Sequence, residues 1–291
     1  MSIKSLRMII TVLFLCVAVF FGIYRVRLYL ITDSTAPVIT AMSDSFEASV
    51  EATNEELLAG MTAEDNLDGD VTGSLVVASK SKFIKKGTLK VNYAAFDKNN
   101  NVGVYTRELT YVDYESPKFS ITRPLRVMNG DTRLNFLDSI KAKDSLDGDI
   151  SAQIMYTLGD KRMINDTASV QTLNLQVTNS AGDTALLETE LNYDDYNTYY
   201  TPSPALRNYV MYVKVGDNPD FRSMVSGIWS GGVVRAFSDT NFEASDVRID
   251  IGKLNMNSPG VYPVLFRLAK SNADGTRDYY GLAKLLVIVE E

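Results

Sequence analysis

The chain has 291 residues, enough for two or three domains of ordinary size, and 45% of them are hydrophobic, as in folded proteins. Its net charge is −7, and it contains no histidine and a single cysteine, Cys16. Such an acidic chain is a poor partner for nucleic acid, because phosphates are bound by lysine and arginine. Without histidine it lacks the commonest general base and metal ligand, and one cysteine permits neither an internal disulfide nor a cysteine–histidine zinc site.

The N-terminal segment is apolar and predicts a transmembrane helix. Residues 8–24 carry no charge, and the run approaches the ~17–25 residues that cross a bilayer. Arg25 and Arg27 can snorkel to the interface, so we expect a span of about residues 8–28. A cleaved signal peptide is the alternative; the missing small-x-small cleavage pair and the long apolar run favour an uncleaved signal anchor. Lys4 and Arg7 favour a cytoplasmic N-terminus, which leaves the C-terminal part outside the cell membrane as a single-pass protein.

A repeat organises the remainder of the chain. The segment AEDNLDGDV at residues 63–71 returns as AKDSLDGDI at residues 142–150, roughly 80 residues later. Pro37 and Pro117 recur at nearly the same offset, as do the tyrosine–aspartate segments at residues 111–114 and 193–196. Three markers with one period indicate a tandem array of one small module rather than a single large domain.

Alternation of apolar and polar residues predicts β-strands in these modules. Residues 87–96 alternate, an asparagine-rich stretch follows at residues 97–101, and residues 102–112 form another β-rich run. A strand, a turn and a strand make a hairpin. The inward positions expected for this strand in the three modules are Leu89, Val91, Tyr93 and Ala95; Leu173, Leu175 and Val177; and Tyr262, Val264, Phe266 and Leu268.

We therefore predict an all-β fold of tandem immunoglobulin-like β-sandwiches after an N-terminal transmembrane helix. The expected divisions are a short cytoplasmic tail with the helix at residues 1–32, module 1 at 33–115, module 2 at 116–197, and module 3, a diverged β domain, at 198–291.

Modules 1 and 2 resemble bacterial immunoglobulin-like surface domains, of the kind found in crystal-toxin and cell-surface proteins. Their shared pattern starts with Asp-x-x-x-Pro at residues 33–37 and 113–117 and continues with Ala-x-Asp-x-x-Asp-Gly-Asp at residues 63–70 and 142–149. It ends with a tyrosine-rich strand and an Asp-x-x-Gly-Asn turn, matched in part by residues 87–101, where Asn100 replaces the glycine. The resemblance implies a structural or binding module of extracellular proteins and no catalytic chemistry.

The repeated aspartates support two interpretations. Carboxylates at alternate positions of a loop can supply the oxygen ligands of calcium, and Asp65, Asp68 and Asp70 are the metal set that we expect under this interpretation. Alternatively, aspartate side chains accept backbone N–H groups within a turn. The residues concerned are Asp65, Asp68, Asp70, Asp144, Asp147 and Asp149.

Aromatic residues near the second boundary give a candidate binding surface made of Ile228, Trp229, Tyr199 and Tyr200. Trp229 lies among glycines and is either an exposed tip or a core residue beside a bend. Tyr199 and Tyr200 either stack on a ligand or pack the joint between modules.

We expect a membrane-anchored extracellular repeat protein that serves as a spacer and as a binding, adhesion or envelope-structural module. Its expected partners are the membrane, through the helix, and a protein or glycan of the cell envelope; we expect no nucleic acid and no cofactor other than calcium. The alternatives are an accessory subunit of an envelope, secretion or pilus-type membrane complex, and a polysaccharide hydrolase, which needs two unlike carboxylates across a cleft.

Overall fold

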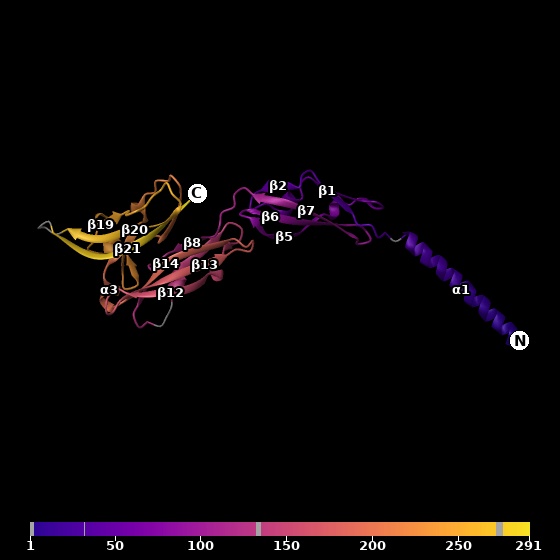
Figure 1. The fold of residues 1–291 in the computed structure, drawn as a ribbon, viewed down its shortest axis with the longest axis horizontal. Helices are drawn as coiled ribbons and strands as arrows, with labels where there is room; N and C mark the ends of the chain where they lie inside the picture. Colours follow the sequence, from indigo (N-terminus) through magenta and orange to yellow (C-terminus); the bar gives the residue numbers. More distant parts are fainter. Residues whose placement is uncertain (1–2, 32, 132–134, 272–275) are drawn as a thin grey trace. The chain divides into compact units, whose positions relative to one another are not determined.

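The computed structural model describes residues 3–31, 33–131, 135–271 and 276–291. It confirms the expected fold class, because an N-terminal helix precedes three pairs of β-sheets (Figure 1). The chain divides into two compact units, Met1–Tyr114 and Glu115–Glu291. The predicted boundary between modules 2 and 3, at residues 197/198, lies inside the second unit.

Helix α1 spans Ile3–Ile31 and contains the predicted apolar run. It holds no proline, so no backbone N–H is missing from its hydrogen-bond ladder. Its stretch Ile3–Leu28 has a mean hydropathy of 2.6, and none of its apolar window is buried by the described parts of the protein. By length and composition this helix can cross a membrane, although a signal sequence has the same properties.

Module 1 is a sandwich of two sheets. The first has the strand order β1-β3-β4, made of Val38–Ala41, Met61–Asp65 and Gly69–Asp70. The second has the order β2-β7-β6-β5, made of Ser45–Ala48, Val102–Tyr111, Thr88–Phe96 and Val76–Lys85. β2 runs parallel to β7, whereas the other pairs are antiparallel.

The core of module 1 follows the predicted alternation. Leu89, Val91, Tyr93 and Ala95 of β6 are all buried. The hydroxyl of Tyr93 donates to the carbonyl oxygen of Leu57, at the end of the short helix α2 (Asn54–Leu57), at 3.0 Å. A buried hydroxyl without such a partner costs free energy, so this contact ties α2 to the core.

Module 2 repeats this strand order. Its sheets are β11-β10-β8, made of Gly148–Asp149, Ile140–Asp144 and Lys118–Ile121, and β12-β13-β14-β9, made of Met155–Met163, Ser169–Thr178, Thr184–Asp194 and Arg126–Met128. β9 runs parallel to β14, as β2 does to β7. The predicted inward residues Leu173, Leu175 and Val177 are buried.

Module 3 has the same strand order although its sequence has diverged. Its sheets are β15-β17-β18, made of Ser203–Leu206, Val225–Ser230 and Val233–Arg235, and β16-β21-β20-β19, made of Val210–Lys214, Arg277–Glu290, Gly260–Ser271 and Val247–Asp250. β16 again pairs in parallel with the last strand, β21. Val264, Phe266 and Leu268 are buried as predicted, whereas Tyr262 is only half-buried.

Short helical turns complete the described chain. α3 spans Tyr196–Tyr200 between modules 2 and 3, with Asp195 accepting from the Thr198 N–H at its start. The 3-10 turns are Thr72–Ser74, Asn135–Ser139, Ser151–Gln153, Phe221–Met224, Phe237–Asp239 and Ala244–Asp246.

One hydrophobic core runs through modules 2 and 3. It joins residues of β8 and β13, such as Phe119 and Leu173, to residues of β20 and β21, such as Phe266 and Val289. Backbone hydrogen bonds follow the same path, because the Tyr209 N–H donates to the Ile121 carbonyl oxygen at 2.8 Å. The two modules are therefore one packed body rather than two independent domains on a linker.

Candidate functional site

The repeated Asp-Gly-Asp loop is built as a hydrogen-bonded turn. In module 1, Oδ1 of Asp65 accepts the N–H groups of Leu67 and Asp68, both at 2.9 Å. Gly69 completes the turn with a φ of 71°, a left-handed conformation that glycine adopts without steric cost. The N–H groups of Asp68 and Leu67 hold the pKa of Asp65 below its usual value, because they stabilise its charged form.

Asp68 and Asp70 each have partners of their own. Asp68 accepts the Lys98 N–H and pairs with the Lys98 ammonium group, both at 2.8 Å. Asp70 accepts the Thr72 N–H at 2.9 Å. Hydrogen bonds from the side chain and then the backbone of Lys98 lower the pKa of Asp68. Hydrogen bonds from the side chain and then the backbone of Thr72 lower the pKa of Asp70 in the same way. The structure therefore does not bring the predicted set of Asp65, Asp68 and Asp70 together around one point.

Asp65 instead meets two aspartates from distant parts of module 1. Asp33 follows helix α1 in the chain, Asp65 ends β3, and Asp97 directly follows β6. Each offers a carboxylate oxygen, and these oxygens lie within 4.8 Å of one another. The three side chains are buried, with Asp33 and Asp65 each only 7% exposed and Asp97 6%. We call this set the three-aspartate cluster.

Two oxygens of the three-aspartate cluster lack a hydrogen-bond partner. Oδ2 of Asp33 and Oδ2 of Asp65 are buried and bond to nothing in the described protein. Their Oδ1 atoms are satisfied, that of Asp33 by the Thr35 N–H at 2.9 Å. Among the described residues, no lysine or arginine forms an ion pair with any of the three carboxylates. Buried charges without partners are costly, so the cluster is the most unusual polar feature of module 1.

Asn101 holds the cluster together from one side. Its amide nitrogen donates to Oδ2 of Asp97 at 2.6 Å and to the Asp33 carbonyl oxygen at 3.1 Å. Its backbone N–H donates to Oδ1 of Asp97 at 2.7 Å. Asn100, with a φ of 64°, supplies the left-handed residue of the same turn, in the place where the family pattern has glycine.

The sequence did not single out Asp33 and Asp97 as site residues. Both stand in the repeat pattern, one before the first proline and one after the tyrosine-rich strand. Neither, however, is near Asp65 in the chain. The available signal was that Asp65 and Asp97 lie at the ends of strands and Asp33 lies in the segment before β1, where loops meet.

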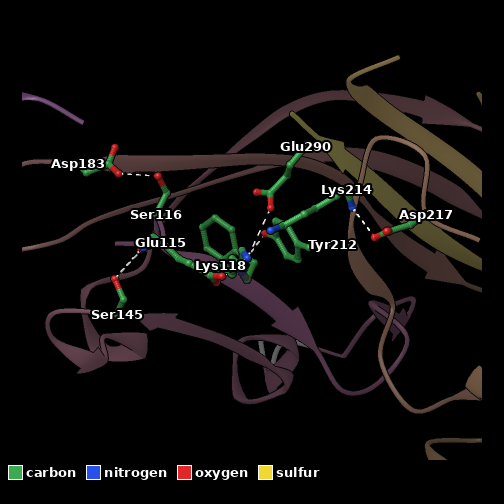
Figure 2. Close-up of polar contacts among 10 residues, drawn as sticks. Glu115, Ser116, Lys118, Ser145, Asp183, Tyr212, Lys214, Asp217 and Glu290 are labelled. Carbon is green, nitrogen blue, oxygen red and sulfur yellow. Dashed lines mark hydrogen bonds and ion pairs between the residues drawn. The ribbon is translucent and has the colours of Figure 1, made fainter. Parts of the chain in front are cut away.

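Module 2 has the same loops but no such cluster among its described residues. Asp144 matches Asp65, and its Oδ2 accepts the side-chain amide of Asn179 at 3.1 Å. Asn179 stands where module 1 has Asp97, because each residue opens the turn between the last two strands. Asp183 stands where module 1 has Asn101, and Ser116 donates to it at 2.7 Å (Figure 2).

The other two aspartates of the module 2 loop are also in turns. Asp147 accepts the Ser180 N–H at 2.6 Å and the Ser180 hydroxyl at 2.7 Å. Asp149 accepts the Ser151 N–H at 2.9 Å. The hydroxyl of Ser151, and then its N–H, lower the pKa of Asp149. In this module, the hydrogen-bonded turn accounts for all three repeated aspartates.

Of the two interpretations of Trp229 left open by the sequence, the structure supports the core residue. Trp229 and Ile228 lie in the middle of β17 and are 2% and 3% exposed. The Arg126 guanidinium lies over the indole ring at 4.6 Å, and the ring of Tyr199 meets it edge to face at 5.2 Å. Arg126 also pairs with Asp194 at 2.6 Å. The glycines around Trp229 were compatible with a tip or a core position, and in the structure β17 buries the ring against Arg126 of module 2.

Tyr199 and Tyr200 lie at this same joint. Tyr199 is half-buried, and its backbone carbonyl accepts the Gly231 N–H at 3.0 Å. Tyr200 is 46% exposed and packs against Tyr199 and Tyr196. Of the predicted binding surface, Tyr200 thus keeps the most accessible ring, while Ile228 and Trp229 belong to the core.

A second set of contacts fixes the other side of the joint between modules 2 and 3. Lys118 of β8 lies 3.5 Å from Glu290 of β21, and its ammonium group lies 5.6 Å from the ring centre of Tyr212 (Figure 2). The Phe119 N–H donates to the Tyr212 hydroxyl oxygen at 2.9 Å. Burial raises the pKa of Tyr212 to about 12, and burial likewise raises that of Tyr209 to about 12.

A cleft of about 630 Å³ opens beside this joint within the second unit. Its walls mix apolar and polar side chains from both modules, among them Arg126, Glu190, Asp194, Tyr209, Leu265 and Lys284. Lys284 pairs with Glu190 across it. A pocket of this size, with a few polar groups on apolar walls, has the character of a ligand site.

No protein-family model matches the chain, and no curated protein matches it. Solved structures show only distant likeness. The M60 catalytic domain with CBM51-1 and CBM51-2 of Clostridium perfringens ZmpB is 11% identical over 88% of this chain and 31% of that one, with a TM-score of 0.20. Human CDH23 EC21-23 is 14% identical over 87% of this chain and 100% of that one, at 0.22. Drosophila N-cadherin EC1-3 is 13% identical over 89% of this chain and 90% of that one, at 0.29.

This chain therefore spans less than a third of the ZmpB structure. At such identities and TM-scores, the likenesses concern the fold alone. They show neither membership of the bacterial surface-domain family nor what this chain binds.

Proposed function

We propose that this chain is a membrane-anchored extracellular protein of the bacterial immunoglobulin-like surface type. In this proposal, it acts without catalysis as a spacer and as a binding or adhesion module of the cell envelope. Its helix holds it in the membrane, and its β-modules present a surface to a protein or glycan partner.

The observation that carries the proposal is the unpartnered apolar helix. Ile3–Leu28 combines a mean hydropathy of 2.6 with side chains that no described part of the protein covers. An apolar helix of this length in water exposes a large hydrophobic surface, whereas a bilayer removes that cost. The modules that follow are β-sandwiches in a chain of net charge −7, which suits an aqueous compartment.

The binding role rests on modules 2 and 3. Their common core makes them a rigid support, and rigid supports commonly present ligand sites on their loops and joints. The cleft beside Arg126, Glu190 and Lys284 is the place where we expect a partner to bind. The non-catalytic role rests on the absence of histidine from the sequence and on repeated aspartates that are used in turns.

Cysteine labelling in cells tests the anchor and the orientation together. In a Cys16→Ser background, which leaves no other cysteine, the Ser238→Cys variant places a thiol on an exposed residue of module 3. We expect a membrane-impermeant maleimide to label it in intact cells, and the protein to stay in the membrane after carbonate extraction. The Cys16→Ser parent is the unlabelled control. Labelling only after lysis, or a mature protein that lacks residues 3–31, would contradict the proposal.

A further inference from the structure

We propose that the three-aspartate cluster of module 1 binds a divalent cation of the calcium type, held by Asp33, Asp65 and Asp97. This site differs from the loop set of Asp65, Asp68 and Asp70 that the sequence suggested. The inference is independent of the anchor and of the joint cleft, because all three ligands lie in module 1.

The first reason is the electrostatic state of the cluster. Three carboxylates that are each at least 93% buried meet within 4.8 Å, and no described cation pairs with them. Like charges at this separation repel, and burial removes the water that would screen them. A divalent cation removes most of this repulsion, as it does in sites built from oxygen ligands.

The second reason is the pair of unpartnered oxygens. Oδ2 of Asp33 and Oδ2 of Asp65 are buried without any hydrogen bond, although their Oδ1 atoms are satisfied by backbone N–H groups. Buried polar atoms are nearly always partnered, so two such atoms in one cluster point to a ligand that the protein itself does not supply. The N–H groups that hold the Oδ1 atoms also fix the orientation of the carboxylates.

The spacing of the oxygens fits calcium. Two oxygens bound at ~2.3–2.6 Å to one ion are at most about 4.6–5.2 Å apart, and the cluster lies within 4.8 Å. Magnesium binds at ~2.0–2.1 Å and demands near-ideal octahedral geometry, which three aspartates from separate loops are poorly placed to supply. Calcium tolerates irregular sets of six to eight oxygens and accepts water for the remainder.

Module 2 shows how the same fold manages without a cation. There Asn179 replaces the third carboxylate and donates its amide to Oδ2 of Asp144 at 3.1 Å. The matching position of the first aspartate, Asp113, is used elsewhere, because it accepts the Ser49 hydroxyl at 2.6 Å and the Val50 N–H at 2.8 Å. Asp65 has no such amide donor, and the cation takes its place.

Such a cation would tie three segments to one another. Asp33 belongs to the segment that leaves α1, Asp65 to the end of β3, and Asp97 to the turn before β7. Asn101 already bridges two of these segments through Asp33 and Asp97. Calcium would therefore order the start of module 1 directly after the helix.

Calorimetric titration of the full chain in detergent tests the site. We expect CaCl₂ to bind with a stoichiometry of about one and to raise the thermal midpoint of module 1, and MgCl₂ to bind at least tenfold more weakly. Asp97→Asn recreates the arrangement of module 2, so it should fold and lose at least tenfold in calcium affinity. Asp70→Asn, at a loop aspartate outside the cluster, is the matched control and should keep its affinity within twofold.

The outcomes separate the alternatives. Loss of calcium affinity in Asp70→Asn, with affinity kept in Asp97→Asn, would overturn the assignment in favour of the sequence-predicted loop set. No calcium binding by the full chain would overturn the proposal. Neither result bears on the cysteine-labelling test of the anchor, so the two proposals fail separately.

Discussion

Modules 1 and 2 share a strand order and a repeated Asp-Gly-Asp loop, yet they treat the same buried carboxylate differently. In module 2, Asn179 donates its amide to Asp144, and the carboxylate is satisfied. In module 1, the corresponding turn residue is Asp97, and Asp65 keeps an unpartnered oxygen. The exchange of Asn179 for Asp97 at this position therefore separates a network in which the buried carboxylate is fully hydrogen-bonded from one in which it keeps an unpartnered oxygen.

The exchange is reciprocal within the turn. Module 1 has Asp97 and Asn101, whereas module 2 has Asn179 and Asp183 in the same two places. Both turns keep one carboxylate and one amide, and in both the backbone N–H of the second residue donates to the side chain of the first. What differs is the chemical group that faces the aspartate of the neighbouring loop, a carboxylate from Asp97 in module 1 and an amide from Asn179 in module 2. A repeat can thus gain or lose a ligand site without changing its backbone.

The modules also differ in whether they share a core, because module 2 packs against module 3 and module 1 forms a unit of its own. This difference predicts the largest loss of stability. Phe266→Ala in module 3 removes a side chain that is 0% exposed, and we expect a loss of about 3–5 kcal/mol in the free energy of unfolding. Because the core is shared, hydrogen exchange should rise in β13 of module 2 as well as in β20.

Leu109→Ala in module 1, also at 0% exposure, is the matched control. It should raise exchange in residues 33–114 and leave modules 2 and 3 unchanged. If Phe266→Ala left the exchange of β13 unaltered, modules 2 and 3 would be independent domains and the single-body description would be wrong.

Asn179→Asp should give the next largest loss of stability, and it places in module 2 the residue type that module 1 has at this position. It replaces the amide that donates to Asp144 by a second buried carboxylate. We expect a loss of about 2–4 kcal/mol near pH 7, because an unpaired buried charge costs that much.

Calcium should not rescue Asn179→Asp, because Asp113 is engaged by Ser49 and Val50 and supplies no third ligand. Thermal unfolding at pH 7, with and without calcium, measures the loss of stability and the lack of rescue. A variant as stable as the wild type at pH 7 would show that the amide of Asn179 is not what satisfies Asp144.

Tyr212→Phe tests the joint between modules 2 and 3, which has no counterpart in the unit of module 1. It leaves the buried Phe119 N–H without its acceptor, and we expect a loss of about 1–3 kcal/mol. The wild-type protein should also lose stability between about pH 10 and about 12. In that window the unfolded tyrosine releases its proton while the buried one, with a pKa of about 12, keeps it.

The Tyr212→Phe variant should lose less stability over this alkaline range, since the raised pKa of Tyr212 no longer contributes while that of Tyr209 remains. Denaturant midpoints at pH 8, 10 and 12 measure the difference. Identical alkaline slopes for the variant and the wild type would contradict the burial of the Tyr212 hydroxyl at the joint.

Asp97→Asn should have the smallest effect, and in the opposite direction. In chelator, we expect the variant to be more stable than the wild type by about 1 kcal/mol, because its amide can donate to Asp65 as Asn179 donates to Asp144. In saturating calcium the order should reverse. Chemical unfolding under both conditions measures this, and a variant less stable in both would mean that Asp97 has another structural role.

The sequence predicted the sandwich better than the site, for a physical reason. Strand patterns are local, so the alternation of Leu89, Val91 and Tyr93 was enough to predict which face of β6 is buried. The three-aspartate cluster is non-local, because Asp33, Asp65 and Asp97 come from distant parts of the chain and meet only when both sheets have formed.

Trp229 shows a second limit of local patterns. Its glycine neighbours left a loop tip and a core position both open; Gly227 lies within β17 and Gly231 directly follows it. The guanidinium over the buried ring of Trp229 belongs to Arg126, which comes from β9 of another module. Sequence composition around one residue cannot show a partner that the fold brings from elsewhere.

Hydrogen exchange of the full chain in detergent, with calcium and with chelator, tests the contrast between the modules most directly. The account predicts that calcium protects residues 33–37, 61–70 and 97–103 of module 1. It predicts no change at residues 140–149 and 179–185, which match the second and third of these segments in module 2. Protection of both modules alike, or of neither, would contradict it.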